Sequence, residues 1–220
     1  MKTAMILAAG RGERLLPLTE TVPKCLCLVK GKPLIEHHII NLARAGFERL
    51  IINHAYLGGK IRQFAGNGEQ WGVDIVYSPE PPGGLETGGG IVNALPLFAN
   101  RPFITVNADI YTDYDFLQIP FETVNTVHLV LIPRNPKLLH HGDFGLESNG
   151  IVSNCSNEYT FSGIAAYHPN IFSQCMQGRY SVAPLIRSYV DQHLATGSRH
   201  YGFWFDIGSM DRLAAANAYS

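Results

Sequence analysis

A short apolar stretch that runs directly into a glycine turn constrains this chain more than any other feature. Residues 4–9 are apolar and are followed at once by Gly10 and Gly12. The cations Arg14 and Lys24 come shortly afterwards. Because glycine has no Cβ, the backbone at these positions can bend sharply and turn its N–H groups toward an anion. The segment therefore predicts a buried strand that ends in a phosphate-binding loop.

Two better-known phosphate loops do not fit this segment. A P-loop needs Lys directly after its second glycine and then Ser or Thr, whereas Gly12 is followed by Glu13 and Arg14. The dinucleotide-binding fingerprint needs a third glycine where this chain has Leu15. We therefore interpret the loop as a different kind of site for a nucleoside triphosphate.

The composition is typical of an ordinary enzyme domain without a nucleic-acid or membrane surface. The 220 residues are 46% hydrophobic, and 17 Lys and Arg against 18 Asp and Glu leave a formal net charge of −1. Such a chain can bury the core of a single domain, residues 1–220. We expect a cytoplasmic protein, because no apolar run approaches the roughly 20 residues of a membrane span. The oligomeric state stays open.

Strands and helices alternate along the first half of the sequence. Apolar runs predict strands at 4–9, 50–53, 73–77 and 103–107. Helical spacing predicts helices at 33–45, 57–65 and 89–98. This alternation predicts a Rossmann-like, mixed but mostly parallel sheet with helices on both faces. Ligands bind outside the carboxyl ends of such strands, so Gly10 and Asp109 should lie close together.

From about residue 126 the sequence changes to extended segments joined by turns. Strands are predicted at 127–132, 143–147, 151–154, 161–167 and 203–206, and helices near 182–195 and 210–219. Residues 148–150, Ser-Asn-Gly, have the composition of a hairpin turn. We interpret about 1–125 as a nucleotide-binding part and about 126–220 as a β-rich substrate part that continues the same sheet.

A second glycine-rich segment, residues 83–90, precedes a predicted helix. Backbone amides at a helix N-terminus are suited to binding an anion or a base edge. A flexible loop capped by Thr87 explains the same residue types equally well.

Two acids follow apolar strands. Asp109 comes after residues 103–107, and Asp206 ends the strand predicted at 203–206. A carboxylate in such a position either holds a magnesium ion or caps the next turn. The residues alone favour capping for Asp109, whereas Ser209 is better placed than Asp206 to cap the last helix.

Residues 10–24 resemble the signature G-x-G-x-R-x-x-P-L-T-x-x-x-P-K of the sugar-1-phosphate nucleotidyltransferases. Residues 106–109 and 203–209 are similar to the N-G-D and W-x-D-I-G-T segments of that family. The resemblance covers essentially the whole chain and implies the nucleotide-diphospho-sugar transferase fold with a β-rich sugar-binding part. Two positions depart from the family: Ala108 replaces a glycine, and Cys25 replaces a proline.

The resemblance also implies the roles of individual residues. Arg14, Lys24 and Asp109 form the expected catalytic set, and Asp109 and Asp206 are the expected Mg²⁺ ligands. Expected nucleotide-binding residues are Ala8, Gly10, Arg11, Gly12, Glu13, Lys24, Glu80, Glu86, Thr87 and Gly88. Expected sugar-binding residues are Asn107, Gly142, Asp143, Thr160 and Ser162. Beside this sugar loop, the orientations of four further side chains stay open: Arg134, Lys137, His140 and His141.

Softer segments, among them 52–55, 85–90 and 112–116, are similar to the branch that uridylylates N-acetylmuramate α-1-phosphate in peptidoglycan recycling. The implied reaction transfers UMP from UTP to the sugar-1-phosphate and releases pyrophosphate. Two alternatives keep this chemistry: mannose-1-phosphate with GTP, or glucose-1-phosphate with dTTP or UTP. A third is a catalytically silent nucleotide-sugar sensor, which the retention of both cations and both acids disfavours.

Overall fold

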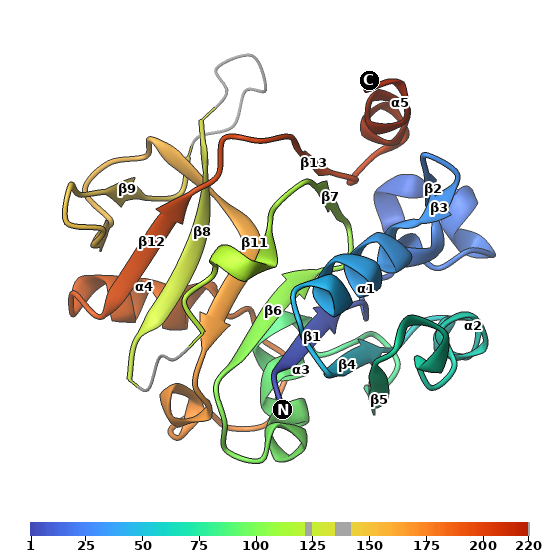
Figure 1. Cartoon of the computed structure of the whole chain (residues 1–220), viewed down its shortest axis with the longest axis horizontal. Helices are drawn as coiled ribbons and strands as arrows, with labels where there is room; N and C mark the ends of the chain where they lie inside the picture. Colours follow the sequence, from blue (N-terminus) through green and yellow to red (C-terminus); the bar gives the residue numbers. More distant parts are fainter. Residues whose placement is uncertain (122–124, 135–141, 220) are drawn as a thin grey trace.

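The computed structural model describes residues 1–121, 125–134 and 142–219 and centres on one twisted sheet (Figure 1). Its seven strands have the order β12-β8-β11-β6-β1-β4-β5. Four of them form a parallel block, namely β1 (Thr3–Leu7), β4 (Arg49–His54), β5 (Asp74–Pro79) and β6 (Phe103–Asn107). The others are β8 (Val127–Pro133), β11 (Tyr159–Tyr167) and β12 (Ala195–Arg199). The predicted mixed, mostly parallel sheet is confirmed.

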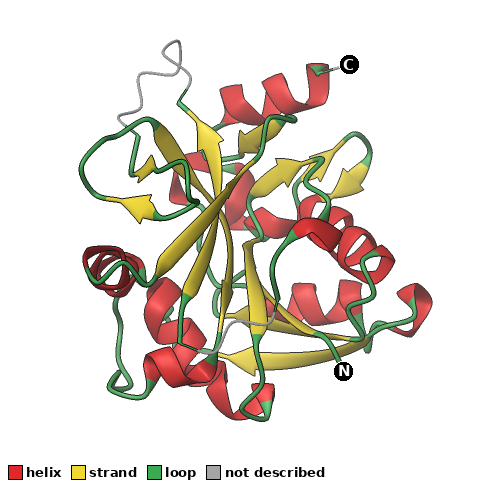
Figure 2. Cartoon of the chain, turned by 60° about the vertical axis from the view of Figure 1, so that its left-hand side comes forward, coloured by secondary structure: helices red, strands yellow, loops and turns green. Residues whose placement is uncertain are grey.

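The α-helices of the described residues lie on both sides of the sheet (Figure 2), except the last one, which packs against residues 28–29 and 204–206 instead. They are α1 (Leu34–Arg44), α2 (Gly58–Ala65), α3 (Glu86–Ala94), α4 (Ala183–Asp191) and α5 (Met210–Ala218). Shorter 3₁₀ turns are Glu13–Leu15, Leu18–Glu20, Lys24–Leu26, Glu69–Trp71, Leu95–Phe98, Phe116–Gln118 and Pro169–Phe172. Within the described ranges, none of the helices combines the length and the apolar character needed to cross a bilayer.

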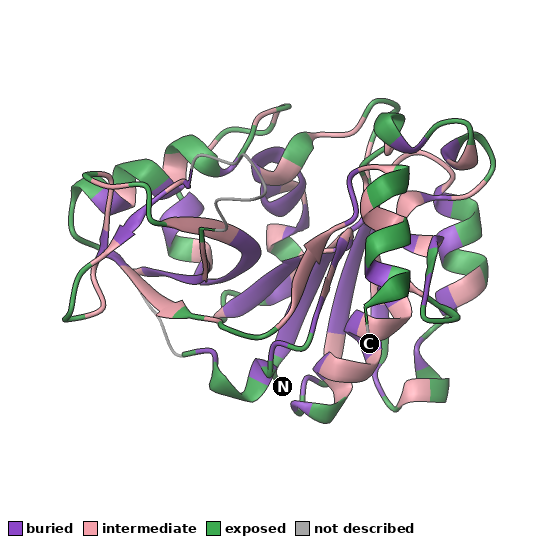
Figure 3. Cartoon of the chain, turned by 90° about the horizontal axis from the view of Figure 1, so that it is seen from above, coloured by how far each residue is buried: buried purple, intermediate pink, exposed green. Residues whose placement is uncertain are grey.

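The interior strand β1 separates two apolar cores. Alternate residues of a strand point to opposite faces, so Ala4 and Ile6 pack with α1 and α2 while Met5 packs with α3 and α4. All three side chains are fully buried. Strands that are covered on both faces read as continuous apolar runs, which is why this segment is apolar without a break. Figure 3 shows this buried centre between helices with exposed outer faces.

Three small two-stranded sheets lie outside the main sheet. They are β2 (Leu28–Val29) with β3 (Lys32–Pro33), β7 (Ile110–Thr112) with β13 (Trp204–Asp206), and β9 (Gly145–Leu146) with β10 (Val152–Ser153). The β9–β10 pair confirms the predicted hairpin turn, since the Gly150 amide donates to the Glu147 carbonyl at 3.0 Å. The strands predicted at 143–147 and 151–154 are each only two residues long.

The helix predicted near 182–195 is wrong over its last turn. Helix α4 ends at Asp191, and residues 195–199 form the edge strand β12, which runs parallel to β8. The segment Ala-Thr-Gly-Ser-Arg has little apolar alternation, so its sequence does not indicate a strand. The glycine at position 197 has a steric reason, because a Cβ there would lie 2.9 Å from the Val152 side chain.

Helix α3 begins earlier than the sequence predicts. The prediction was 89–98, whereas the helix starts at Glu86 and its end continues as a 3₁₀ turn over Leu95–Phe98. This earlier start places the last three glycines of the second glycine-rich segment inside the helix, while Gly83 and Gly84 stay before it. Gly88, Gly89 and Gly90 are all buried there.

Strand β11 joins the two halves of the chain in one sheet. It runs antiparallel between β6 and β8, with Ile164 opposite Val106 on one side and Ala165 opposite Leu129 on the other. The second half therefore extends the sheet of the first.

Candidate active site

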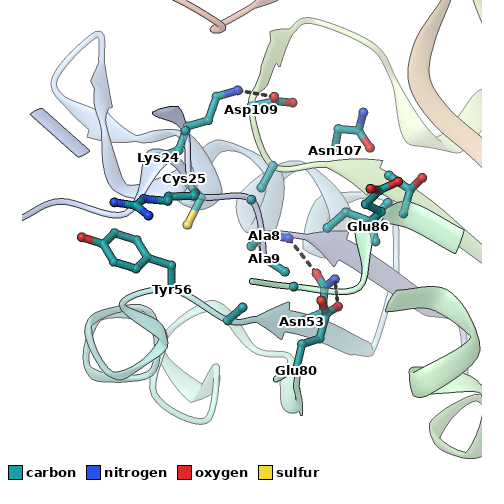
Figure 4. A pocket seen from close by; sticks show the side chains of 18 of the residues that line it. Ala8, Ala9, Lys24, Cys25, Asn53, Tyr56, Glu80, Glu86, Asn107 and Asp109 are labelled. Atoms are coloured by element: carbon teal, nitrogen blue, oxygen red, sulfur yellow. Dashed lines mark hydrogen bonds and ion pairs between the residues drawn. The ribbon is translucent and has the colours of Figure 1, made fainter. Parts of the chain in front are cut away.

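A cavity of about 1110 Å³ opens at the carboxyl ends of β1, β4 and β6 (Figure 4). One wall is residues 8–14, named the phosphate loop after the ligand expected there, and another is residues 80–87, named the base loop in the same way. Predicted site residues that line the cavity are Ala8, Gly10, Arg11, Gly12, Glu13, Arg14, Lys24, Glu80, Glu86, Thr87, Asn107 and Asp109. The fold thus brings together the glycine turn and the first acid, which are about a hundred residues apart in sequence.

The phosphate loop is closely packed at Gly12 and borders free space at Gly10. Gly12 has φ 72°, a left-handed conformation, and a Cβ there would lie 3.0 Å from the Lys24 Cβ. The Thr19 hydroxyl donates to the Gly12 carbonyl at 2.9 Å. By contrast, a Cβ at Gly10 would meet nothing within 4 Å. The lysine stem therefore packs on the rear of the turn, while the tip of the turn borders open space.

Most amides of this loop are available for a ligand. The Ala8 amide is an exception, because it donates to Asn53 Oδ1 at 2.7 Å. Across the described part of the chain, the amides of residues 9–12 have no hydrogen-bond acceptor. Successive free N–H groups beside cationic side chains form an anion-binding concavity.

Lys24 and Asp109 form an ion pair in the cavity lining. Lys24 Nζ donates to Asp109 Oδ2 at 2.5 Å, and Figure 4 shows the pair at the top of the site. The lysine side chain is 13% exposed and the carboxylate 31%. A charge-assisted contact of this kind is among the stronger hydrogen bonds in proteins.

Asp206 lies beside Asp109 through the small β7–β13 sheet. It pairs with Ile110 in that sheet, and the Ile207 amide donates to the Asp109 carbonyl at 2.8 Å. The Asp206 carboxylate itself forms an ion pair with Arg212 of α5. Asp206 does not line the cavity, but Gly208, two residues later, does.

Two carboxylates at neighbouring strand ends fit a magnesium ion that is held mainly by substrate phosphates. Mg²⁺ is commonly bound by one or two carboxylates, with waters and phosphate oxygens completing its octahedron. Among the described residues, no group of three or more His, Cys, Asp or Glu could hold a metal without such a substrate. The donor set therefore suits a metal that arrives with a polyphosphate.

Arg14 reaches the same corner of the site from the phosphate loop. A Cβ at Gly208 would lie 2.8 Å from Arg14 Nη2, so the guanidinium lies directly against that glycine. Arg11, at the loop tip, stacks its guanidinium 5.2 Å from the ring centroid of Tyr56. Tyr56 also lines the cavity, and its hydroxyl donates to the Glu20 carbonyl at 2.9 Å.

The base loop is held from behind by residues 178–182, which the sequence analysis did not identify. The Tyr180 carbonyl accepts from the amides of Gly88 at 2.9 Å and Gly89 at 3.1 Å. The Val182 amide donates to Thr87 Oγ1 at 2.9 Å. The Gly88 amide is thus not open to a ligand, and Thr87 is not the helix cap, because α3 begins at Glu86.

Arg179 is the cavity residue of this segment. It lines the cavity and forms an ion pair with Glu86, with 3.3 Å between Nε and Oε1. No motif marks it in the sequence, since its partner is 93 residues away. Asn53 is different, because it follows the apolar run 50–52 and the rule that sites lie at strand ends could have found it.

Of the predicted sugar-binding residues, only Asn107 lines the cavity. Its side chain lies against Gly163 of β11, where a Cβ would come within 2.7 Å of Asn107 Nδ2. Gly163 has φ 83° and lies in the irregular stretch of the β11–β8 pairing. Gly163 thus supports a cavity residue from behind, while Arg179 and Gly208 of the second half line the cavity themselves.

The other predicted sugar-binding residues have structural partners. Asp143 Oδ2 accepts from the Phe161 amide at 2.8 Å, and Ser162 Oγ accepts from the Ile164 amide at 3.1 Å. Gly142 packs against the Asn157 carbonyl, and Thr160 lies in β11. Arg134 is exposed and does not line the cavity. Three predicted neighbours lie outside the described residues: Lys137, His140 and His141.

Cys25 lines the cavity but is not a reactive thiol. Burial raises its pKa to about 12, so the thiol is neutral at physiological pH. A neutral thiol is a poor nucleophile. The residue therefore fills the position beside Lys24 without adding chemistry.

Residues 3–132 match the family described as Nucleotidyl transferase. The whole chain is 46% identical to N-acetylmuramate alpha-1-phosphate uridylyltransferase of Neisseria meningitidis serogroup B, over 98% of this chain and 96% of the relative. It is 31% identical to the protein of the same name from Caulobacter vibrioides, over 99% of this chain and 96% of the relative.

Solved structures share the fold at lower sequence identity. The crystal structure of HddC from Yersinia pseudotuberculosis in complex with GMP-PN superposes with a TM-score of 0.79 at 19% identity. The match covers 99% of this chain and 98% of HddC. The predicted nucleotide-diphospho-sugar transferase fold is confirmed.

Proposed function

This chain belongs to the nucleotidyl transferase family, and on that premise we propose that it transfers UMP from UTP to N-acetylmuramate α-1-phosphate. The products would be UDP-N-acetylmuramate and pyrophosphate, and we place the reaction in peptidoglycan recycling in the cytoplasm. One observation carries the proposal: the open amides of the phosphate loop, Lys24 and Asp109 line one cavity in a chain 46% identical to the Neisseria enzyme.

The reaction needs alignment and positive charge rather than a protein nucleophile. The sugar phosphate is already ionised at neutral pH, so its oxygen can attack the α-phosphorus of UTP without a general base. Amides of residues 9–12 would bind the triphosphate, and Lys24 and Arg14 would offset the charge of two approaching polyanions. Pyrophosphate leaves as the P–O bond opposite the incoming oxygen breaks.

Asp109 and Asp206 would hold a Mg²⁺ ion, which adds positive charge at the triphosphate when bound. Lys24 would then leave the Asp109 carboxylate and donate to a phosphate oxygen instead. Arg212 would keep one oxygen of Asp206 oriented from α5. We expect EDTA to abolish turnover and added Mg²⁺ to restore it.

The two substrates would bind at opposite ends of the cavity. The base loop and Glu80 would contact the uracil, while Asn107 and the Gly163 turn lie on the side of the second half and would contact the sugar. A backbone carbonyl, an amide and a carboxylate provide both donors and acceptors for a pyrimidine edge.

A pyrophosphate-release assay with Mg²⁺ tests the proposal. It crosses UTP, dTTP, GTP, ATP and CTP with the 1-phosphates of N-acetylmuramate, N-acetylglucosamine, glucose and mannose. We expect the highest kcat/KM for UTP with the muramate ester. Another best pair would retain the chemistry and refute the assigned substrates, and silence across the whole grid would refute nucleotidyl transfer.

A further inference from the structure

Asn53 connects the phosphate loop to the neighbouring strand through a buried carboxamide. It lies at the end of β4 and is 2% exposed. Its Oδ1 accepts from the Ala8 amide at 2.7 Å, and its Nδ2 donates to Glu80 Oε1 at 2.6 Å. Both ends of the amide group are therefore used, and its orientation is fixed because only this one pairs donors with acceptors.

Glu80 continues the connection into the base loop. Its second oxygen, Oε2, accepts from the Leu85 amide at 2.7 Å. Leu85 is the residue before the first turn of α3. The Glu80 amide also donates to the His54 carbonyl at 2.9 Å, which fixes the main chain below the carboxylate. Figure 4 shows Asn53 and Glu80 side by side beneath Ala8.

Helix α3 passes directly over Asn53 and Glu80. A Cβ at Gly90 would lie 2.6 Å from Glu80 Oε1 and 2.8 Å from Asn53 Nδ2. A side chain at this position would force the carboxylate and the amide apart. The Asn53–Glu80 pair thus explains why position 90 is a glycine.

We propose that Asn53 is a positioning residue for the nucleoside triphosphate. Through Glu80 it sets the distance between the phosphate loop, which would bind the phosphates, and the base loop, which would bind the base. It acts through other residues, since both polar atoms of its side chain are engaged within the protein. The inference rests on the proposed function for the assignment of the two loops, and it predicts an effect on the triphosphate alone.

An exchange of the two functional groups tests the pair. Asn53→Asp keeps the acceptor for the Ala8 amide but places two carboxylates in contact. Glu80→Gln replaces one of the two acceptor oxygens with an NH2 group, so either Asn53 Nδ2 or the Leu85 amide loses its acceptor. The double variant restores every donor and acceptor, with the charge moved from one residue to the other. We expect each single variant to weaken UTP binding by about tenfold or more and the double variant to recover most of that loss.

The readouts are the UTP dissociation constant by calorimetry and the KM values of both substrates. Each single variant should raise the KM of UTP and leave that of the sugar-1-phosphate within about twofold, because the loss of a hydrogen bond acts on the loops it joins. Asn93→Asp is the matched control: its Nδ2 donates to Ser78 Oγ at 3.0 Å, between α3 and β5, outside the cavity lining. It should leave UTP binding unchanged.

Three results would overturn the proposal. These are a double variant that binds UTP no better than Asn53→Asp, equal KM increases for both substrates, or an equal effect of Asn93→Asp. Because Glu80 is half-buried, Glu80→Gln tests the same contact even if Asn53→Asp does not fold. Calorimetry measures UTP binding without a sugar-1-phosphate, so a failure of the muramate assignment leaves this test intact.

Discussion

At the scale of single residues, each of the two expected metal ligands is paired with a cation. Lys24 neutralises Asp109, and Arg212 neutralises Asp206. Two carboxylates that would repel each other can lie at neighbouring strand ends because each has its own cation. We expect a polyphosphate with its metal to replace one of these pairings, so removal of either member of the Lys24–Asp109 pair should have a distinct kinetic signature.

Asp109→Asn should lower kcat by roughly a hundredfold or more, because it removes the charge that would hold the metal while keeping the shape of the side chain. Pyrophosphate release measures the rate, and thermal unfolding checks that the fold is retained. Wild-type turnover in a folded variant would remove Asp109 from the reaction.

Lys24→Ala should raise the KM of the triphosphate by about tenfold and affect the sugar-1-phosphate much less, because the lysine stem packs on the phosphate loop and the side chain lines the cavity. Separate titrations of the two substrates give this comparison. Equal losses for both substrates would mean that Lys24 does not act on the triphosphate in particular.

At the scale of elements, helix α3 and residues 178–182 form one assembly that shapes the base loop. The Tyr180 carbonyl binds two amides of the first turn of α3, and Arg179 pairs with Glu86. Glycines make this contact possible, since a Cβ at Gly89 would lie only 1.9 Å from the Gly178 carbonyl oxygen. The geometry of the base loop therefore depends on a segment from the other half of the chain.

Gly89→Ala should destabilise the protein by roughly 1–3 kcal/mol and weaken triphosphate binding, because the new methyl group forces the two backbones apart. Gly59→Ala is the control, since this exposed position in α2 has no atom within 4 Å of an added Cβ and alanine favours a helix. Urea unfolding measures the free energy of unfolding of both variants, and equal values would contradict the steric argument.

The sequence predicted those features that depend on residues close together in the chain, such as helix ends. Gly46 follows the end of α1 with φ 79°, and Ser209 Oγ caps α5 by accepting from the Arg212 amide, the second as predicted. Strand β12 was missed because its pairing with β8 is a long-range contact of a segment without apolar alternation. The contact of Tyr180 with α3 was missed because it is also long-range and because it is made by a backbone carbonyl, which has no sequence signature.

The candidate site was predictable to the extent that it follows strand ends. Asp109 and the phosphate loop come together because parallel strands end at one edge. Asp143 and Ser162 were predicted from resemblance, but their side chains accept from neighbouring amides and do not line the cavity. The metal role of Asp206 stays a prediction, because its carboxylate pairs with Arg212 and Asp206 does not line the cavity.

At the scale of the whole molecule, two buried histidines connect stability to pH. Burial lowers the pKa of His38 and that of His128 to about 4, against about 6.5 for an exposed imidazole. The unfolded chain therefore binds protons first as the pH falls. Stability from both groups is fully present above about pH 6.5 and is lost as the pH falls toward 4.

Between pH 7 and pH 5 we expect the free energy of unfolding to fall by roughly 1–2 kcal/mol for each of these histidines. Urea unfolding at the two pH values measures the total. His128→Gln removes one titrating group and can still bond Thr196 and Ser198, the hydroxyl partners of His128. The pH-dependent loss should be smaller in this variant by roughly 1–2 kcal/mol, and an unchanged loss would exclude His128 as a source.

Strand β11 also determines how the chain can be divided. Because it pairs with β6 on one side and β8 on the other, a fragment that stops before it leaves the β6 backbone as a bare, apolar edge. A fragment that starts with β8 keeps β11 and loses the strand on which it packs. We therefore expect neither half to be expressible alone in soluble form, and complementation to require that both fragments be made together.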